Sequence, residues 1–167
     1  LAIALNRLGE NHPQVTDIYL QLSNSYMADS MYTESIGYVD HALENLYGSY
    51  DFKQSFDPER TITDPVSLLR AIIIKAQILS NRGEGVNIKD YKESLMALRW
   101  AADLVDMVQK SFKNEASKLQ LIEKNYSIYT GAVELLSILY DETGDARYLD
   151  QIFETIEKSR SRVTLEL

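Results

Sequence analysis

Cysteine is absent from the 167-residue chain, which excludes a disulfide scaffold, a thiolate zinc site and a cysteine nucleophile within these residues. Long apolar runs are absent too, because the most apolar stretch, residues 68–79, is interrupted by Arg70, Lys75 and Gln77. A membrane-spanning helix needs about 20 predominantly apolar residues, so no span is predicted. Basic residues number 17 against 25 acidic ones, and the formal net charge of -8 argues against a general nucleic-acid or anionic-membrane binder.

Proline and glycine are scarce, with three and seven residues, and they divide the chain into blocks because both are disfavoured inside helices. Within the blocks, apolar residues recur at three- and four-residue steps, as in amphipathic helices. No segment alternates with period two for long enough to compete as a strand. The predicted fold class is all-α, with a loop over residues 50–63 and helices over 1–8, 13–27, 32–47, 65–81, 88–112, from 114 or 117 to 141, and 147–163.

The predicted helices pair into antiparallel hairpins at residues 13–48, 64–113 and 115–163, and residues 1–9 form the last helix of a preceding repeat. Hairpins that recur every 40 to 50 residues or so are each too small to bury their own apolar face. A stacked solenoid is therefore favoured, and a closed helical bundle is the alternative.

The chain starts with Leu1 instead of methionine and has no signal-cleavage pattern, so we expect a cytoplasmic segment that is excised from a longer protein. Cut ends of a solenoid expose apolar faces that capping repeats would cover. We therefore expect self-association through the uncapped ends, where Leu1, Ile3, Leu5 and Leu8 cover the first face incompletely.

One hairpin carries a recognisable motif. Large residues and one small residue follow the spacing Tyr19-x2-Leu22-Ser23-x2-Tyr26, and the pattern continues with Tyr32, Ser35, Val39, Ala42 and Leu43. This segment resembles the tetratricopeptide repeat, and residues 9–15 resemble the linker of its longer type in kinesin light chains. The resemblance implies a right-handed superhelix. Degenerate copies of the motif begin at Ile72 and Val133.

The second half of the chain has a narrower resemblance, which covers residues 68–167 and is most specific at Glu157-Lys158-Ser159-Arg160. It is similar to the segment that links tetratricopeptide repeats to a CHAT domain in bacterial multidomain proteins. CHAT domains resemble caspase-type cysteine proteases. The resemblance implies that the catalytic histidine and cysteine would lie beyond Leu167, so we expect no enzyme activity within these residues.

Candidates for chemistry within the chain are few. His12 and His41 are far apart and lack metal-site spacing, so we expect no metal or other cofactor. We expect His12 to form turn or helix-start hydrogen bonds beside Pro13, and His41 to lie on a helix surface or between repeats. Residues 83–85 lack the third glycine of a dinucleotide loop and are interpreted as a helix connection. Asp141, Glu142 and Asp145 are interpreted as a solvated turn instead of a catalytic carboxylate pair.

The family resemblance implies that the first helix of each hairpin lines a concave groove that binds peptides. By motif position, Asp17, Gln21 and Asn24 point into this groove, and the amides can hydrogen-bond a peptide backbone. Lys75 and Lys124 are further groove candidates from the later repeats. Two groove lysines would favour an acidic peptide, and ordinary surface lysines are the alternative.

Lys158, Arg160 and Arg162 form one compact basic cluster next to Glu157. Cations in the last turn of a helix are favoured by the helix dipole and need no partner. The CHAT resemblance implies instead that these four residues dock on the adjoining domain, where arginine can pair with carboxylates.

The sequence therefore predicts a protein-interaction module, the regulatory array of a CHAT-type protein, in which binding of a peptide or protein partner biases the neighbouring domain. A stand-alone adaptor and a receptor for a small signalling peptide are the alternatives, and an enzyme within these residues is the most remote hypothesis.

Overall fold

The computed structural model describes the backbone of residues 1–10, 12–82, 86–111 and 115–164, and their side chains outside 111–126 and 161–164. The described residues form seven α-helices and no strand, which confirms the all-α prediction. Each helix begins and ends within three residues of its predicted bounds. The helices are α1 Ala2–Leu8, α2 Pro13–Ala28, α3 Tyr32–Tyr47, α4 Pro65–Asn81, α5 Ile88–Ser111, α6 Glu115–Thr143 and α7 Arg147–Thr164.

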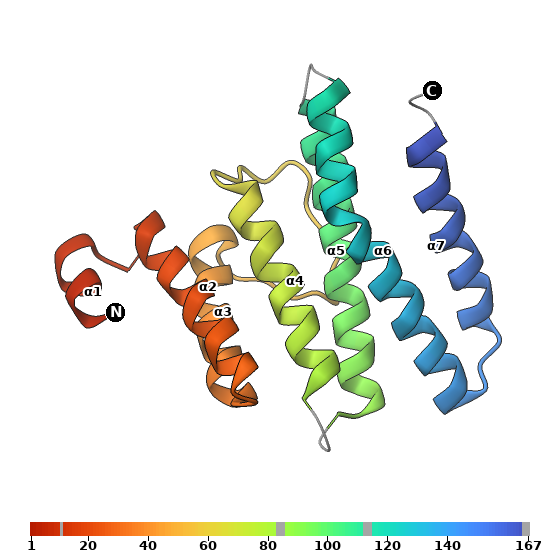
Figure 1. The fold of residues 1–167 in the computed structure, drawn as a ribbon, viewed down its shortest axis with the longest axis horizontal. Helices are drawn as coiled ribbons and strands as arrows, with labels where there is room; N and C mark the ends of the chain where they lie inside the picture. Colours follow the sequence, from red (N-terminus) through yellow and green to blue (C-terminus); the bar gives the residue numbers. More distant parts are fainter. Residues whose placement is uncertain (11, 83–85, 112–114, 165–167) are drawn as a thin grey trace.

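The helices lie in a row that runs from α1 at one end to α7 at the other (Figure 1). Each helix packs against the next one in the chain, and α2 also contacts α4. The chain termini lie at opposite ends of this row. The described residues therefore form an open row of hairpins, in which α1 packs on α2 and α7 packs on α6 at the opposite end.

Helix starts follow from local capping chemistry. Pro13 and Pro65 occupy first-turn positions, where a missing N–H is tolerated. His12 Nδ1 accepts a hydrogen bond from the backbone N–H of Gln14 at 3.2 Å, as predicted for this histidine. Asp64 Oδ1 accepts from the backbone N–H of Ser67 at 3.0 Å and caps α4 in the same way.

Hydrogen bonds of small serine side chains join the two helices of a hairpin. Ser35 Oγ on α3 donates to the backbone oxygen of Ser23 on α2 at 2.7 Å, and Ser23 Oγ donates in return to the backbone oxygen of Ser35 at 2.9 Å. In the next hairpin, Ser94 Oγ on α5 donates to the backbone oxygen of Ala76 on α4 at 2.8 Å. Ser23 and Ala76 hold the same position in the repeat motif, so the two hairpins share one type of contact.

The loop between α3 and α4 is part of the core. Its Phe52 and Phe56 are buried against Trp100 of α5, with ring centroids 5.1 Å and 5.6 Å away. Trp100 Nε1 donates to the backbone oxygen of Gln54 at 2.7 Å. The sequence predicts the loop but not its burial.

Burial divides the row into a central and a peripheral part. Helix α4 has nine buried residues, because it lies between neighbours on both sides. The described residues of α7 include none that are buried. This last helix exposes Leu149 and Phe153, and the latter side chain is 69% exposed.

Candidate functional site

The predicted groove residues of α2 share one exposed face. Asp17, Gln21 and Asn24 are exposed and lie three or four residues apart, so they stand on the same side of the helix. Asp17 Oδ1 pairs with Arg70 Nη1 of α4 at 3.6 Å, and both side chains are about half exposed. Asp17 and Arg70 each lie six residues before the small residue of their repeat motif, so equivalent positions of α2 and α4 meet on this face.

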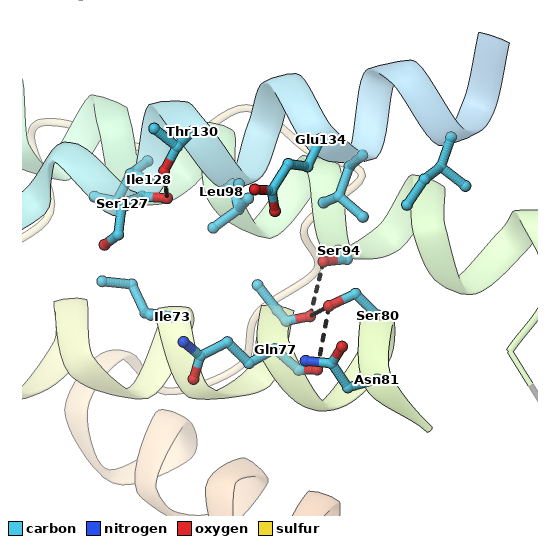
Figure 2. Close-up of a pocket in the computed structure, with 14 residues that line it drawn as sticks. Ile73, Gln77, Ser80, Asn81, Ser94, Leu98, Ser127, Ile128, Thr130 and Glu134 are labelled. Carbon is cyan, nitrogen blue, oxygen red and sulfur yellow. Dashed lines mark hydrogen bonds between the residues drawn. The ribbon is translucent and has the colours of Figure 1, made fainter. Parts of the chain in front are cut away.

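The same side of α4 forms a pocket of about 340 Å³ with α6, and residues of α5 form part of its lining (Figure 2). Gly131 of α6 stands over Leu98 of α5, where an added Cβ would come within 3.3 Å of Leu98 Cδ1. Polar side chains from both helices line the pocket. They are Gln77, Ser80 and Asn81 of α4, and Ser127, Thr130 and Glu134 of α6.

Several hydroxyl groups in this pocket donate hydrogen bonds to backbone oxygens. Ser80 Oγ donates to the carbonyls of Ala76 and Gln77 at 3.1 and 3.2 Å. Thr130 Oγ1 donates to the carbonyl of Ser127 at 3.2 Å, and the Ser94 hydroxyl is engaged at the hairpin contact described above. The lone pairs of these oxygens remain able to accept, so the pocket offers more acceptors than donors.

The lining residues of this pocket were not among the groove candidates from sequence. Gln77 follows Ala76 as Asn24 follows Ser23, so the motif position of Asn24 would have identified it. Thr130 and Glu134 give no comparable signal, because their role depends on how α6 packs beside α4.

Lys75 lies elsewhere than predicted. Its side chain is only 8% exposed, and Nζ pairs with Asp40 Oδ1 of α3 at 2.6 Å. Tyr50 donates to the same carboxylate oxygen at 2.6 Å. Burial, and then this hydrogen bond to Asp40, raises the pKa of Tyr50 far above its usual range. Lys75 therefore joins two hairpins and is not a groove lysine, which corrects the sequence interpretation; the Lys124 side chain is outside the described residues.

Among the docking candidates whose side chains the structure describes, Lys158 and Arg160 line different grooves. Lys158 lines a second, wider groove of about 760 Å³ between α5, α6 and α7, together with Asp103 and Glu154. Arg160 lines a different groove between α6 and α7, and its Nη1 lies 3.9 Å from Glu157 Oε1. Residues two positions apart on a helix point in different directions, which explains the separation. The side chain of Arg162 is outside the described residues.

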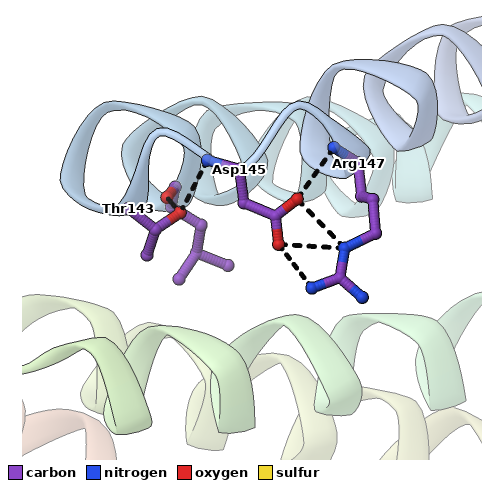
Figure 3. Close-up of polar contacts among 4 residues, drawn as sticks. Thr143, Asp145 and Arg147 are labelled. Carbon is purple, nitrogen blue, oxygen red and sulfur yellow. Dashed lines mark hydrogen bonds and ion pairs between the residues drawn. The ribbon is translucent and has the colours of Figure 1, made fainter.

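The turn before α7 has the character predicted for it. Asp145 Oδ1 accepts from the backbone N–H of Arg147 at 3.0 Å, and its carboxylate pairs with the Arg147 guanidinium at 2.6 Å (Figure 3). These hydrogen bonds lower the pKa of the Asp145 carboxyl. Asp141 and Glu142 are exposed at the end of α6. The three carboxylates therefore belong to a solvated helix connection.

His41 is exposed, and its ring stacks on Tyr19 with centroids 5.2 Å apart. Within the part of the chain that the structure describes, no group of three or more metal-ligating side chains is close enough to hold an ion. Over the same residues, no helix combines the length and apolarity needed to cross a membrane.

Comparisons with known proteins returned no similarity. The chain matches no protein-family model, and searches of curated proteins and of solved structures gave no significant match. A functional assignment therefore depends on the arrangement of the residues described above.

Proposed function

We propose that this chain is a protein-interaction module whose hairpins stack as a right-handed, tetratricopeptide-like superhelix, and whose α2–α4–α6 face binds a peptide segment of a partner protein. The main support is the pocket between α4 and α6, which is lined by polar side chains from both helices. A peptide has unpaired backbone N–H and C=O groups, and amide and hydroxyl side chains can satisfy both.

The repeated hairpin contact supports a tetratricopeptide-like stack. Ser35 and Ser94 donate to the backbone of the first helix at the same motif position in two successive hairpins. The ion pair of Asp17 with Arg70 joins the first helices of these hairpins on the proposed peptide-binding face. In a superhelix of this kind the first helices line the concave side.

In this proposal the last helix, α7, connects the array to a neighbouring CHAT-like domain, and peptide binding biases that domain. Support comes from the exposed apolar side chains of Leu149 and Phe153, and from the charged residues Glu157 and Lys158, which are exposed as well. Exposed apolar side chains next to charged ones are typical of interaction surfaces.

A self-associating adaptor is the second candidate. Its support is the exposure of apolar side chains at both ends of the row, where Ile3 is 73% and Phe153 is 69% exposed. Burial of both against a second copy would remove apolar area from water.

The peptide-binding proposal is tested by panning a display library of random linear peptides against the immobilised protein. Ser127→Trp fills the α4–α6 pocket from an exposed position, and Glu142→Trp adds the same side chain to an exposed position of α6 outside it. Selected peptides should bind the wild type and Glu142→Trp equally, and Ser127→Trp roughly tenfold more weakly or worse. A library without an enriched peptide family, or peptides that bind Ser127→Trp as tightly as the wild type, would contradict the proposal.

A further inference from the structure

We infer that the α4–α6 pocket binds the side chain of a lysine or arginine residue of the partner, with Glu134 as its counter-charge. This inference rests on the proposed peptide-binding function and specifies the chemistry of the ligand. It reverses the acidic-peptide hypothesis, which depended on Lys75 and Lys124 as groove cations.

The charge of Glu134 is not compensated within the described part of the protein. Its side chain is exposed and extends from α6 toward α4 (Figure 2), and no ion pair joins it to another described residue. The nearby cations are engaged elsewhere. Arg70 pairs with Asp17, Lys75 with Asp40, and Arg82 with Asp90 at 3.3 Å. Arg160 lines the groove between α6 and α7, which Glu134 also borders, and its guanidinium pairs with Glu157 at 3.9 Å.

The other polar groups of the pocket suit a donor-rich ligand. An ammonium group has three N–H donors and a guanidinium has five, and neither has an acceptor. The oxygens of Ser80 and Thr130 can accept such bonds, because their own protons are already donated to backbone carbonyls. A carboxylate ligand would meet these oxygens and the charge of Glu134, with donors from the amides of Gln77 and Asn81 and from the hydroxyl of Ser127.

The apolar residues that line the pocket suit the long aliphatic stem of a lysine or arginine side chain. Lysine and arginine bury an aliphatic stem and place the charge at its end. The pocket volume of about 340 Å³ lies in the range of small-molecule sites. The apolar residues that line it beside the polar ones are Ile73, Leu98, Ile128, Leu135 and Ile138.

The charge of the whole chain acts in the same direction. A net charge of -8 attracts a basic segment and repels an acidic one during diffusional encounter. This long-range attraction alone would not select a position within the peptide. A site-specific requirement for one basic residue is therefore the property that distinguishes the pocket from general attraction.

The experiment compares peptides selected from the random library on the wild type, on Glu134→Gln and on Glu142→Gln. The last variant removes the same charge from the same helix outside the pocket, so it controls for net charge. For one selected peptide, Kd is measured by fluorescence anisotropy with each protein. The measurement is repeated with each basic residue of the peptide changed in turn to methionine, which retains a long apolar stem.

Peptides selected on the wild type should be enriched in lysine or arginine at one position. Glu134→Gln should weaken binding roughly fivefold to tenfold, and Glu142→Gln should change it by less than about twofold. The methionine peptide at the enriched position should bind both the wild type and Glu134→Gln with the same weakened Kd.

Two results would overturn the inference separately from the proposed function. Selected peptides that bind only when the pocket is open, but that are not enriched in lysine or arginine, would support the peptide-binding function and contradict the proposed basic ligand. If basic peptides lose the same affinity for Glu134→Gln and for Glu142→Gln, the net charge of the protein explains their selection and the pocket does not. A library that yields no family at all would overturn both proposals.

Discussion

Replacing Asp40 with asparagine removes the counter-charge of a buried ammonium. Lys75 reaches from α4 to α3 with only 8% of its side chain exposed, and the carboxylate of Asp40 lies 2.6 Å from its Nζ. The substitution preserves the size of the side chain, and its amide oxygen can still accept from Tyr50. The change in stability therefore reports on the charge and hardly on packing.

The expected loss for Asp40→Asn is about 2–3 kcal/mol in the free energy of unfolding. Breaking a buried ion pair by removal of one partner costs about 3–5 kcal/mol. We expect less here because the side chain of Asp40 is 36% exposed, so water reaches one side of the pair. The reciprocal change, Lys75→Met, should cost only about 1 kcal/mol, because Asp40 remains partly hydrated and keeps its hydrogen bond from Tyr50.

The assay is denaturant unfolding at neutral pH, followed by circular dichroism and by the fluorescence of Trp100, the single tryptophan. Both probes must give the same transition, since stacked repeats can unfold in parts. In the double variant, Asp40→Asn with Lys75→Met, we expect a loss of about 1–2 kcal/mol, smaller than the sum of the single losses.

The order of the two single variants is the critical result. If Lys75→Met is more destabilising than Asp40→Asn, an unpaired Asp40 carboxylate costs more than an unpaired Lys75 ammonium, and the argument from the burial of Lys75 is wrong. Single losses that add in the double variant to within about 0.5 kcal/mol would show that the two residues are not coupled.

Three further predictions concern other parts of the chain. Asp145→Ala removes the cap of α7 and should speed amide hydrogen exchange in the first turn of that helix. Because the pKa of the Asp145 carboxyl is lowered in the folded state, this protection is present above about pH 4 and is lost as the pH falls through the folded pKa. Equal exchange rates in the variant and the wild type would refute the role of the cap. The pKa of Tyr50 is raised by folding, so its contribution is present below about pH 10 and is lost as the pH rises further. The unfolding midpoint of Tyr50→Phe should therefore fall less than that of the wild type between about pH 9 and pH 11, and parallel declines would argue against it. Phe153→Asp should reduce self-association, measured by light scattering at high protein concentration, and a wild type that stays monomeric there would contradict the adaptor candidate.

The positions of the helices are local properties, and they were predictable for that reason. Pro13 and Pro65 fit only near a helix start, and Gly48 ends α3 with a φ of 80°, a conformation that other residues rarely adopt. The small residues Ser23 and Ser35 were recognised by their spacing, and they lie where α2 and α3 meet. Each of these signals lies within one helix or one hairpin of the sequence.

The candidate site was only partly predictable. Motif position indicated the exposed face of α2, and the same reasoning would have reached Gln77. It failed for Lys75, because its exposure depends on α3, where Asp40 lies 35 residues earlier in the chain. Glu134 was missed because an exposed glutamate on a helix has no distinctive sequence signal.

The sequence by itself determined the all-α class, the order and bounds of the helices and their caps. It could do so because period, proline, glycine and capping side chains act within one or two turns of backbone. Tertiary structure alone decided that Lys75 is buried, that Trp100 packs on a loop, and that Glu134 and Gln77 line the same pocket. These outcomes depend on which helix faces meet and how close they come, and a sequence pattern within one helix carries no such distance.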